Sequence, residues 1–393
     1  MSFVNIISAI GNNSSVYPLI VRDCGIEVPT KVTLTYQQNL KDSKEMANNA
    51  LRERLIDEYG TSAVWLGGIP LIDRLCDKVI RKLGYNTDIN PKLFKETKSQ
   101  GLKMNLEKAK KLSNQAEKDL RKILENKKTY ERLLAGKFIL STAIPIAIMG
   151  FFLPKANFKL TSKLREKNNS KRQNSEIAFR GTSSVFANMS TVNKMAITDG
   201  GLTAGRVSTG RNKFEKLEMA YKMLGMMFLN FVAPIWISKM LNMVSGNIFK
   251  TNVNLDPKIL ADKNFIKNIY SIKLPDNDVI DFLEKNPDEI FSKFADKFCG
   301  KGKYFVNGKR NLLTYIDKNK VLGLKKELEK FINQAKESKN AEKFAKKALR
   351  IKSANIITNV CLSSFLLAYC LPKSTFWLRK RVTGSDAEPG LVG

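Results

Sequence analysis

The chain has 393 residues, 43% of them hydrophobic, and it carries a formal net charge of +30 with no histidine. This is the composition of a folded protein with room for two or three domains, so global disorder is not expected. The absence of histidine excludes histidine-containing catalytic triads and metal sites. The basic excess favours a polyanionic partner, although a coding bias toward Lys, Asn and Ile explains the charge equally well.

The cysteines give no sign of a zinc site or a disulfide framework. They are Cys24, Cys76, Cys299, Cys361 and Cys370. No two form a C-x-x-C pair and their number is odd, which favours a reducing compartment. The N-terminal stretch MSFVNIISAIGNN has no basic residue ahead of its short apolar run, so a cleaved secretory signal is not expected.

The N-terminal mixed region, residues 1–100, is predicted to change from extended to helical structure along its length. Residues 1–39 mix β-branched residues with turn formers, which predicts extended structure with turns. From about Leu40 the apolar spacing becomes helical. Pro70 follows two glycines, which predicts a break or kink near Gly67.

Residues 101–155 are predicted to form one region. Apolar residues recur every three or four positions over 102–134, which predicts a basic amphipathic helix that continues into a first uncharged segment, 138–154. Residues 156–216 are basic and rich in Gly, Ser and Asn, a composition typical of a mobile loop.

A second uncharged segment, 223–238, lies within the predicted region 217–245. Residues 246–320 then have the pattern of a small soluble helical unit, with helix-start signals and amphipathic faces. Asn307 and Gly308 stand between apolar residues there and are typical of a two-residue hairpin turn.

A second basic amphipathic helix begins near Val321 and continues into a third uncharged segment, 353–372. Both belong to the predicted region 321–381, which is followed by a flexible tail, 382–393. The predicted fold is therefore mainly α, with long basic amphipathic helices and about three short hydrophobic ones. Minor β structure is expected at the N-terminus and near 303–313.

The pattern Leu-Pro-Lys-x-x-Phe-x-Leu occurs twice, at 153–160 and 371–378, each time after an amphipathic helix and an uncharged segment. The matching surroundings predict an internal repeat. In a membrane protein these motifs would lie at the interface with water. The residues expected there are Leu153, Pro154, Lys155, Phe158, Leu160, Leu371, Pro372, Lys373, Phe376, Trp377 and Leu378.

The three uncharged segments, 138–154, 223–238 and 353–372, are flanked by lysines and contain 17, 16 and 20 residues. A transmembrane helix needs about 20 residues. Aromatic residues near the segment ends and prolines within the first two are common in membrane helices, so we expect membrane insertion. The alternative is a set of central helices in a soluble bundle. Flanking Lys and Arg are nearly equal on the two sides, so the positive-inside rule predicts no orientation.

Few motifs indicate chemistry. The Gly-rich stretch 198–211 offers backbone amides with Arg206 and Arg211 to a phosphate, although a flexible linker explains it as well. Other basic residues beside the apolar segments are candidates for anionic lipid headgroups, with a solvated surface as the alternative. They are Lys159, Lys163, Arg165, Arg379, Lys380 and Arg381. No catalytic set, metal site or cofactor motif is predicted, and nothing in the pattern favours an enzyme.

The leading hypothesis is a non-catalytic, membrane-associated helical protein with a scaffolding or interaction role. Its expected partners are anionic lipid headgroups, and also a protein bound through the amphipathic helices. The alternative is a soluble basic helical protein that binds nucleic acid or an acidic partner. A membrane transport protein is the second alternative, and it is the weakest because no ionisable residue lies inside an uncharged segment.

Overall fold

The computed structural model describes residues 2–384 except 14, 42, 95–99, 166–189, 277, 301 and 339, and the side chains of 162–165 also lie outside the description. The described chain is helical almost throughout, which confirms the mainly α prediction. Two compact units are present, and each gathers three stretches of sequence. Unit 1 consists of Met1–Ser8, Cys76–Ala135 and Lys239–Ile357, and unit 2 of Ala9–Leu75, Gly136–Ser238 and Thr358–Gly393.

Unit 1 has the apolar core of an ordinary globular domain. Its largest buried side chains are aromatic, and Phe265 contacts both Phe294 and Phe331 through ring pairs. Its shorter elements are η3 (Pro91–Phe94), α6 (Leu102–Leu112), α7 (Asn114–Glu125), α13 (Pro257–Leu260), α14 (Lys263–Lys267), α15 (Val279–Lys285), α16 (Ile290–Cys299) and α17 (Lys318–Glu337).

The hairpin predicted near 303–313 is present in unit 1. Strand β1 (Phe305–Val306) pairs antiparallel with β2 (Lys309–Arg310). Asn307 and Gly308 both have positive φ, as the tight turns that join such strands require.

The single helix predicted over 102–134 is wrong. It is divided at Ser113, whose hydroxyl accepts a hydrogen bond from the Ala116 amide as the N-cap of α7. A second division at Asn126 separates α7 from α8 (Lys127–Ala147). The apolar period continues across both divisions, but a serine that can cap a helix is enough to restart it.

The extended structure expected in residues 1–39 is also wrong. The structure has α1 (Phe3–Gly11), α2 (Tyr17–Arg22), a π-helical turn η1 (Asp23–Glu27) and α3 (Val28–Asn39). Val28 and Val32 are four residues apart and both are buried, so one side of α3 is packed. Burial of this side outweighs the weak β preference of branched side chains.

Unit 2 is built from six helical segments, five of which contain a π-helical turn. The helices not yet bounded are α4 (Lys44–Ser62), α5 (Ile69–Lys82), α9 (Leu153–Arg165), α10 (Thr191–Thr209), α11 (Lys213–Met227), α12 (Ala233–Phe249), α18 (Ala341–Phe365) and α19 (Leu371–Thr383). The π turns η2 (Ala63–Gly68), η4 (Ile148–Phe152), η6 (Phe228–Val232) and η7 (Leu366–Cys370) join them in pairs.

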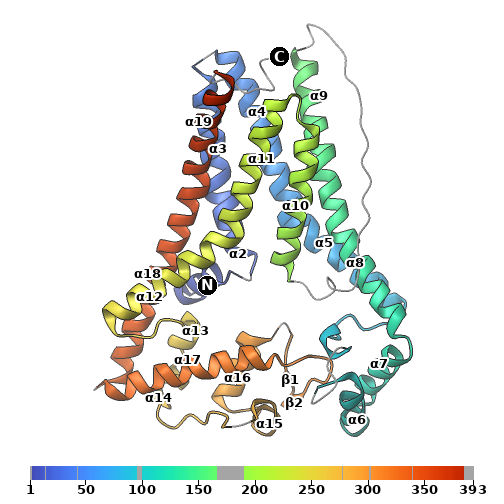
Figure 1. Ribbon diagram of the computed structural model, residues 1–393. Helices are drawn as coiled ribbons and strands as arrows, with labels where there is room; N and C mark the ends of the chain where they lie inside the picture. The colour runs from blue at the N-terminus through green and yellow to red at the C-terminus, as the bar shows by residue number, and fades with distance from the viewer. Residues whose placement is uncertain are drawn as a thin grey trace. The chain divides into compact units, whose positions relative to one another are not determined.

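These segments close into a ring. Helix α3 packs on α4, α4 on α9, and η4, which continues into α9, packs on α10. The ring continues from α10 to α11 and from α11 to α19. Finally η7, which precedes α19, contacts α3 and η1 (Figure 1). Each segment therefore has a neighbour on both sides, and the ring has an interior.

Proline explains the five π turns in the described part of the chain. Each turn ends two residues before a proline, and these prolines are Pro29, Pro70, Pro154, Pro234 and Pro372. The residue before each proline donates its amide to the carbonyl five residues earlier, as Leu153 does to Ile148. A proline ring clashes with the carbonyl four residues back in an α-helix, and the wider turn relieves that clash. Both Leu-Pro-Lys motifs begin immediately after such a turn.

The loop predicted over 156–216 is wrong where the chain is described, since α9 reaches Arg165 and α10 occupies Thr191–Thr209; residues 166–189 lie outside the described part. In α10, Gly201 and Gly205 are four residues apart. A Cβ at Gly205 would lie 3.1 Å from the Cα of Gly150 in η4. Small residues at this spacing let two helix backbones touch, as in many membrane helix pairs.

We expect Gly205→Ala to lower the free energy of unfolding by about 1–3 kcal/mol, because the new methyl group has no space against Gly150. Gly136→Ala in α8 is the matched control, since a Cβ there meets nothing within 4 Å. The measurement is the thermal unfolding midpoint of the detergent-purified protein. Equal midpoints for the two variants would show that the close contact does not matter.

Candidate functional site

Unit 2 buries charged residues beside its apolar cluster, whereas the core of unit 1 is apolar. Ten charged residues are buried in the described chain, and all belong to unit 2. They are Arg22, Glu27, Lys31, Glu53, Glu58, Lys194, Asp199, Arg206, Glu215 and Arg379. Moving an ion out of water costs several kcal/mol unless a partner compensates it, so the partners of these residues define the site.

Helix α4 supplies the carboxylates of the site. Glu53 lies four residues before Asp57 and five before Glu58, so the three share one side of the helix. That side faces the ring interior, because Glu53 and Glu58 are each only 6% exposed. Leu55 and Tyr59, by contrast, are exposed. The helix is therefore turned with its charges inward.

Cations from α10 and α11 meet these carboxylates across the ring. Arg206 in α10 lies 2.6 Å from Asp57, and Lys222 in α11 lies 2.8 Å from Glu58. Arg211, between the two helices, lies 3.6 Å from Glu53. The ring neighbours of α4 are α3 and α9, so these ion pairs join helices that are not adjacent in the ring. These ion pairs therefore connect opposite sides of the ring through its interior.

Glu58 is shared by several cations. Besides Lys222, its carboxylate lies 3.3 Å from Arg54 on the same helix and 4.0 Å from Lys31 on α3. Lys31 also pairs with Glu27 in η1. A single buried carboxylate therefore links three helices, and its loss would leave three cations with reduced compensation.

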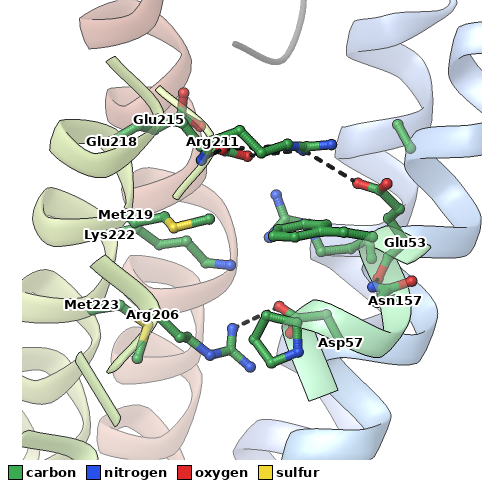
Figure 2. A pocket seen from close by; sticks show the side chains of 14 residues that line it. Glu53, Asp57, Asn157, Arg206, Arg211, Glu215, Glu218, Met219, Lys222 and Met223 are labelled. Carbon is green, nitrogen blue, oxygen red and sulfur yellow. Dashed lines mark hydrogen bonds and ion pairs between the residues drawn. The ribbon is translucent and has the colours of Figure 1, made fainter. Parts of the chain in front are cut away.

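A cavity of about 90 Å³ lies between two of the ion pairs. Figure 2 shows the Arg211–Glu53 pair on one side of it and the Arg206–Asp57 pair on the other. Asn157 of α9 closes a third side and donates its amide to the Glu53 carbonyl at 2.7 Å. The cavity is large enough for a few water molecules or a small solute, and it offers charges of both signs.

Two more ion pairs connect segments of the ring, and Glu218 of the first also lines this cavity. Arg379 of α19 lies 2.5 Å from Glu218 of α11, and Lys194 of α10 lies 2.6 Å from Asp73 of α5. Both join charged groups on different helices. Charge pairing is therefore the recurring contact of the whole ring.

The structure brings four of the sequence-predicted residues together at the cavity. Pro154, Phe158, Arg206 and Arg211 line it, and the Arg211 guanidinium lies 4.3 Å from the centre of the Phe158 ring. Arg379 is buried in its pair with Glu218 instead of facing lipid or water.

The remaining predicted residues lie away from the cavity. Those that are exposed are Lys155, Lys159, Leu160, Lys373, Trp377, Lys380 and Arg381. Leu153, Pro372 and Leu378 are half-buried, whereas Leu371 and Phe376 are buried. Lys163 and Arg165 have side chains outside the described part.

The exterior of unit 2 is apolar. Three helices are long and apolar enough to cross a membrane by length and composition: Lys127–Thr161, Lys213–Phe249 and Ala341–Thr383. Only 44%, 17% and 39% of their most apolar windows is buried. Large side chains such as Phe152, Leu224 and Trp236 are about two-thirds exposed. The central helices of a soluble bundle would instead be covered on all sides.

Sequence reasoning missed the carboxylates of α4 and Lys31. The signal was present, because acidic residues recur at 53, 57 and 58 within a predicted helix. The helix was predicted from its apolar spacing alone, which does not weigh acidic residues at helical spacing.

Comparison of the chain with known protein families, curated proteins and solved structures finds no match. Within the described residues, no group of three or more Cys, Asp or Glu side chains is placed to hold a metal ion.

We expect Asp57→Arg to destabilise the protein by about 3 kcal/mol, because it replaces the partner of Arg206 with a like charge. Adding Arg206→Asp should restore part of the loss, since the exchanged charges can pair again. The measurement is a double-mutant cycle on thermal unfolding. A swapped protein no more stable than the sum of its single variants would show that the pair does not join α4 to α10.

Proposed function

We propose that the protein is a membrane-embedded carrier, in which the helical ring of unit 2 moves a small charged solute across the bilayer. One observation carries this proposal: ten charged side chains are buried in the ring beside a small apolar cluster, while many large apolar side chains are exposed on its exterior. In a water-soluble protein buried charges are rare and the large apolar residues gather inside.

The charged interior favours a carrier over an anchor or scaffold. A charged side chain at the centre of a bilayer costs about 2.5–3.5 kcal/mol by insertion scales, so such residues persist mainly where a path or site needs them. An anchor needs apolar helices alone. Here the charges come from α3, α4 and α10 as well as α11, and all lie outside the uncharged segments. This removes the objection that the uncharged segments themselves contain no ionisable residue.

The ion pairs across the ring suggest how a solute would act. A solute with a carboxylate or an ammonium group that entered the cavity would compete for Arg206 or for Asp57. Loss of the Arg206–Asp57 pair would remove one of the ion pairs that join α4 to α10 and α11. Proline-linked π turns have weakened backbone hydrogen bonding and give five segments a place to bend.

Anionic lipid headgroups are the proposed surface partners. Lys155 and Lys159 of α9 and Lys380 and Arg381 of α19 are exposed next to apolar helices. Each basic residue near an anionic membrane surface contributes about 1 kcal/mol of attraction.

Membrane insertion predicts that the protein stays in the pellet when membranes are washed with alkaline carbonate or with high salt, because apolar burial in lipid does not depend on charge. The measurement is the fraction retained by immunoblot, with a peripheral protein as the control. Release by salt alone would contradict insertion.

A carrier also exposes its central cavity to each side of the membrane in turn. In a protein whose five cysteines are replaced by serine, we expect Asn157→Cys to react with a membrane-impermeant thiosulfonate added to either side of reconstituted vesicles. Lys380→Cys is the control and should react from one side only. Reaction of Asn157→Cys from a single side would contradict the carrier proposal.

A further inference from the structure

A second, smaller cavity of about 30 Å³ lies in the ring interior. It shares Arg206 and Lys222 with the first cavity, but its other polar lining residues are different. Its polar and charged lining residues are Asp23 of η1, Glu58, Thr61 and Ser62 of α4, Asp199 and Arg206 of α10, Lys222 of α11 and Asn230 of η6. Trp65 of η2 also borders it.

Asp199 is the unusual member of this lining. It is only 7% exposed, yet its carboxylate makes no hydrogen bond or ion pair with any residue in the described part of the chain. Asp23 accepts a hydrogen bond from the Ser62 hydroxyl at 2.6 Å, and within the described residues it too has no ion pair. Two carboxylates thus border one small cavity without a cation in contact with either.

Two cations that line the cavity are paired with other carboxylates, whereas Arg22 of α2, buried beside Asp23, donates to the backbone carbonyls of Pro18 and Asn230 and has no ion pair within the described residues. Arg206 lies 2.6 Å from Asp57, and Lys222 lies 2.8 Å from Glu58. Glu27 of η1 is paired with Lys31. Of the other elements packed on α10, η4 has no charged residue, and the charged residues of α9 with described side chains, Lys155 and Lys159, are exposed.

We propose that Asp199 and Asp23 form a proton-binding site inside the ring. A proton taken up by the Asp199 carboxylate removes from a low-dielectric space one of two negative charges that have no direct ion pair. The neutral carboxyl group can then donate a hydrogen bond within the cavity, for which Asp23 and the Asn230 side chain offer acceptors. Only the role of this proton as a coupling ion for transport rests on the proposed carrier function, whereas its binding does not.

A proton suits this cavity better than a metal cation. The space holds about one water molecule, and the described residues contain no group of three acidic or thiol ligands. A carboxyl group needs no coordination shell to hold a proton, so two carboxylates and a small polar cavity suffice.

Trp65 provides a local reporter. It borders the cavity and is 5% exposed, whereas the other two tryptophans, Trp236 and Trp377, are exposed. In detergent-purified protein with Trp236→Phe and Trp377→Phe, we expect the fluorescence of Trp65 to change in one transition as pH is varied. Asp199→Asn should abolish this transition or shift its midpoint. Asp288→Asn, at an exposed residue of unit 1, is the matched control and should leave it unchanged.

Two outcomes would overturn the assignment. One is a pH transition that persists unaltered in Asp199→Asn, with circular dichroism showing that the variant is folded. The other is a fluorescence change produced at fixed pH by sodium chloride but not by choline chloride, which would assign the site to Na⁺. The titration needs neither a solute nor a membrane. Its failure is therefore distinguishable from a failure of the two-sided thiol labelling that tests the carrier.

Discussion

The attraction between opposite charges across a space without bulk water is the constraint on which unit 2 depends. Carboxylates of α4 meet cations of α10 and α11, although α4 is a ring neighbour of neither helix. Such pairs offset the cost of dehydration only if their geometry is good. The ring must therefore hold its six segments in register. Exposed apolar side chains on its exterior, such as Trp236 and Phe152, do not fix the positions of the segments in the same way.

Proline and glycine solve a related problem for the backbone. Five of the six ring segments have one wider turn just before a proline, whereas Pro145 lies inside α8 without one. Helix α10 has no proline and no π turn within its bounds. It carries Gly201 and Gly205 instead, and these let it approach η4 closely. The π turns thus accommodate prolines in five segments, and the glycines of α10 allow a close helix contact in the sixth.

Much of unit 1 could be predicted from the sequence, because its helices bury apolar faces and its hairpin carries Asn307-Gly308 at the turn. Unit 2 could be predicted less well. The usual rule that apolar residues face inward fails for α4, where Leu55 is exposed and Glu53 and Glu58 are buried. Glycines in α10 indicated a loop because their use in close packing depends on a distant partner, Gly150. Spacing along the chain cannot reveal that Asp57 meets Arg206.

The contact between Gly205 and Gly150 sets a boundary on how the ring can deform. Ion pairs are made by long side chains that can swing to new partners, but a backbone-to-backbone approach has no such freedom. We therefore expect helix α10 and the η4–α9 segment to move together as one rigid body. Any opening of the ring then falls at other contacts, such as the one between α11 and α19 where Arg379 pairs with Glu218.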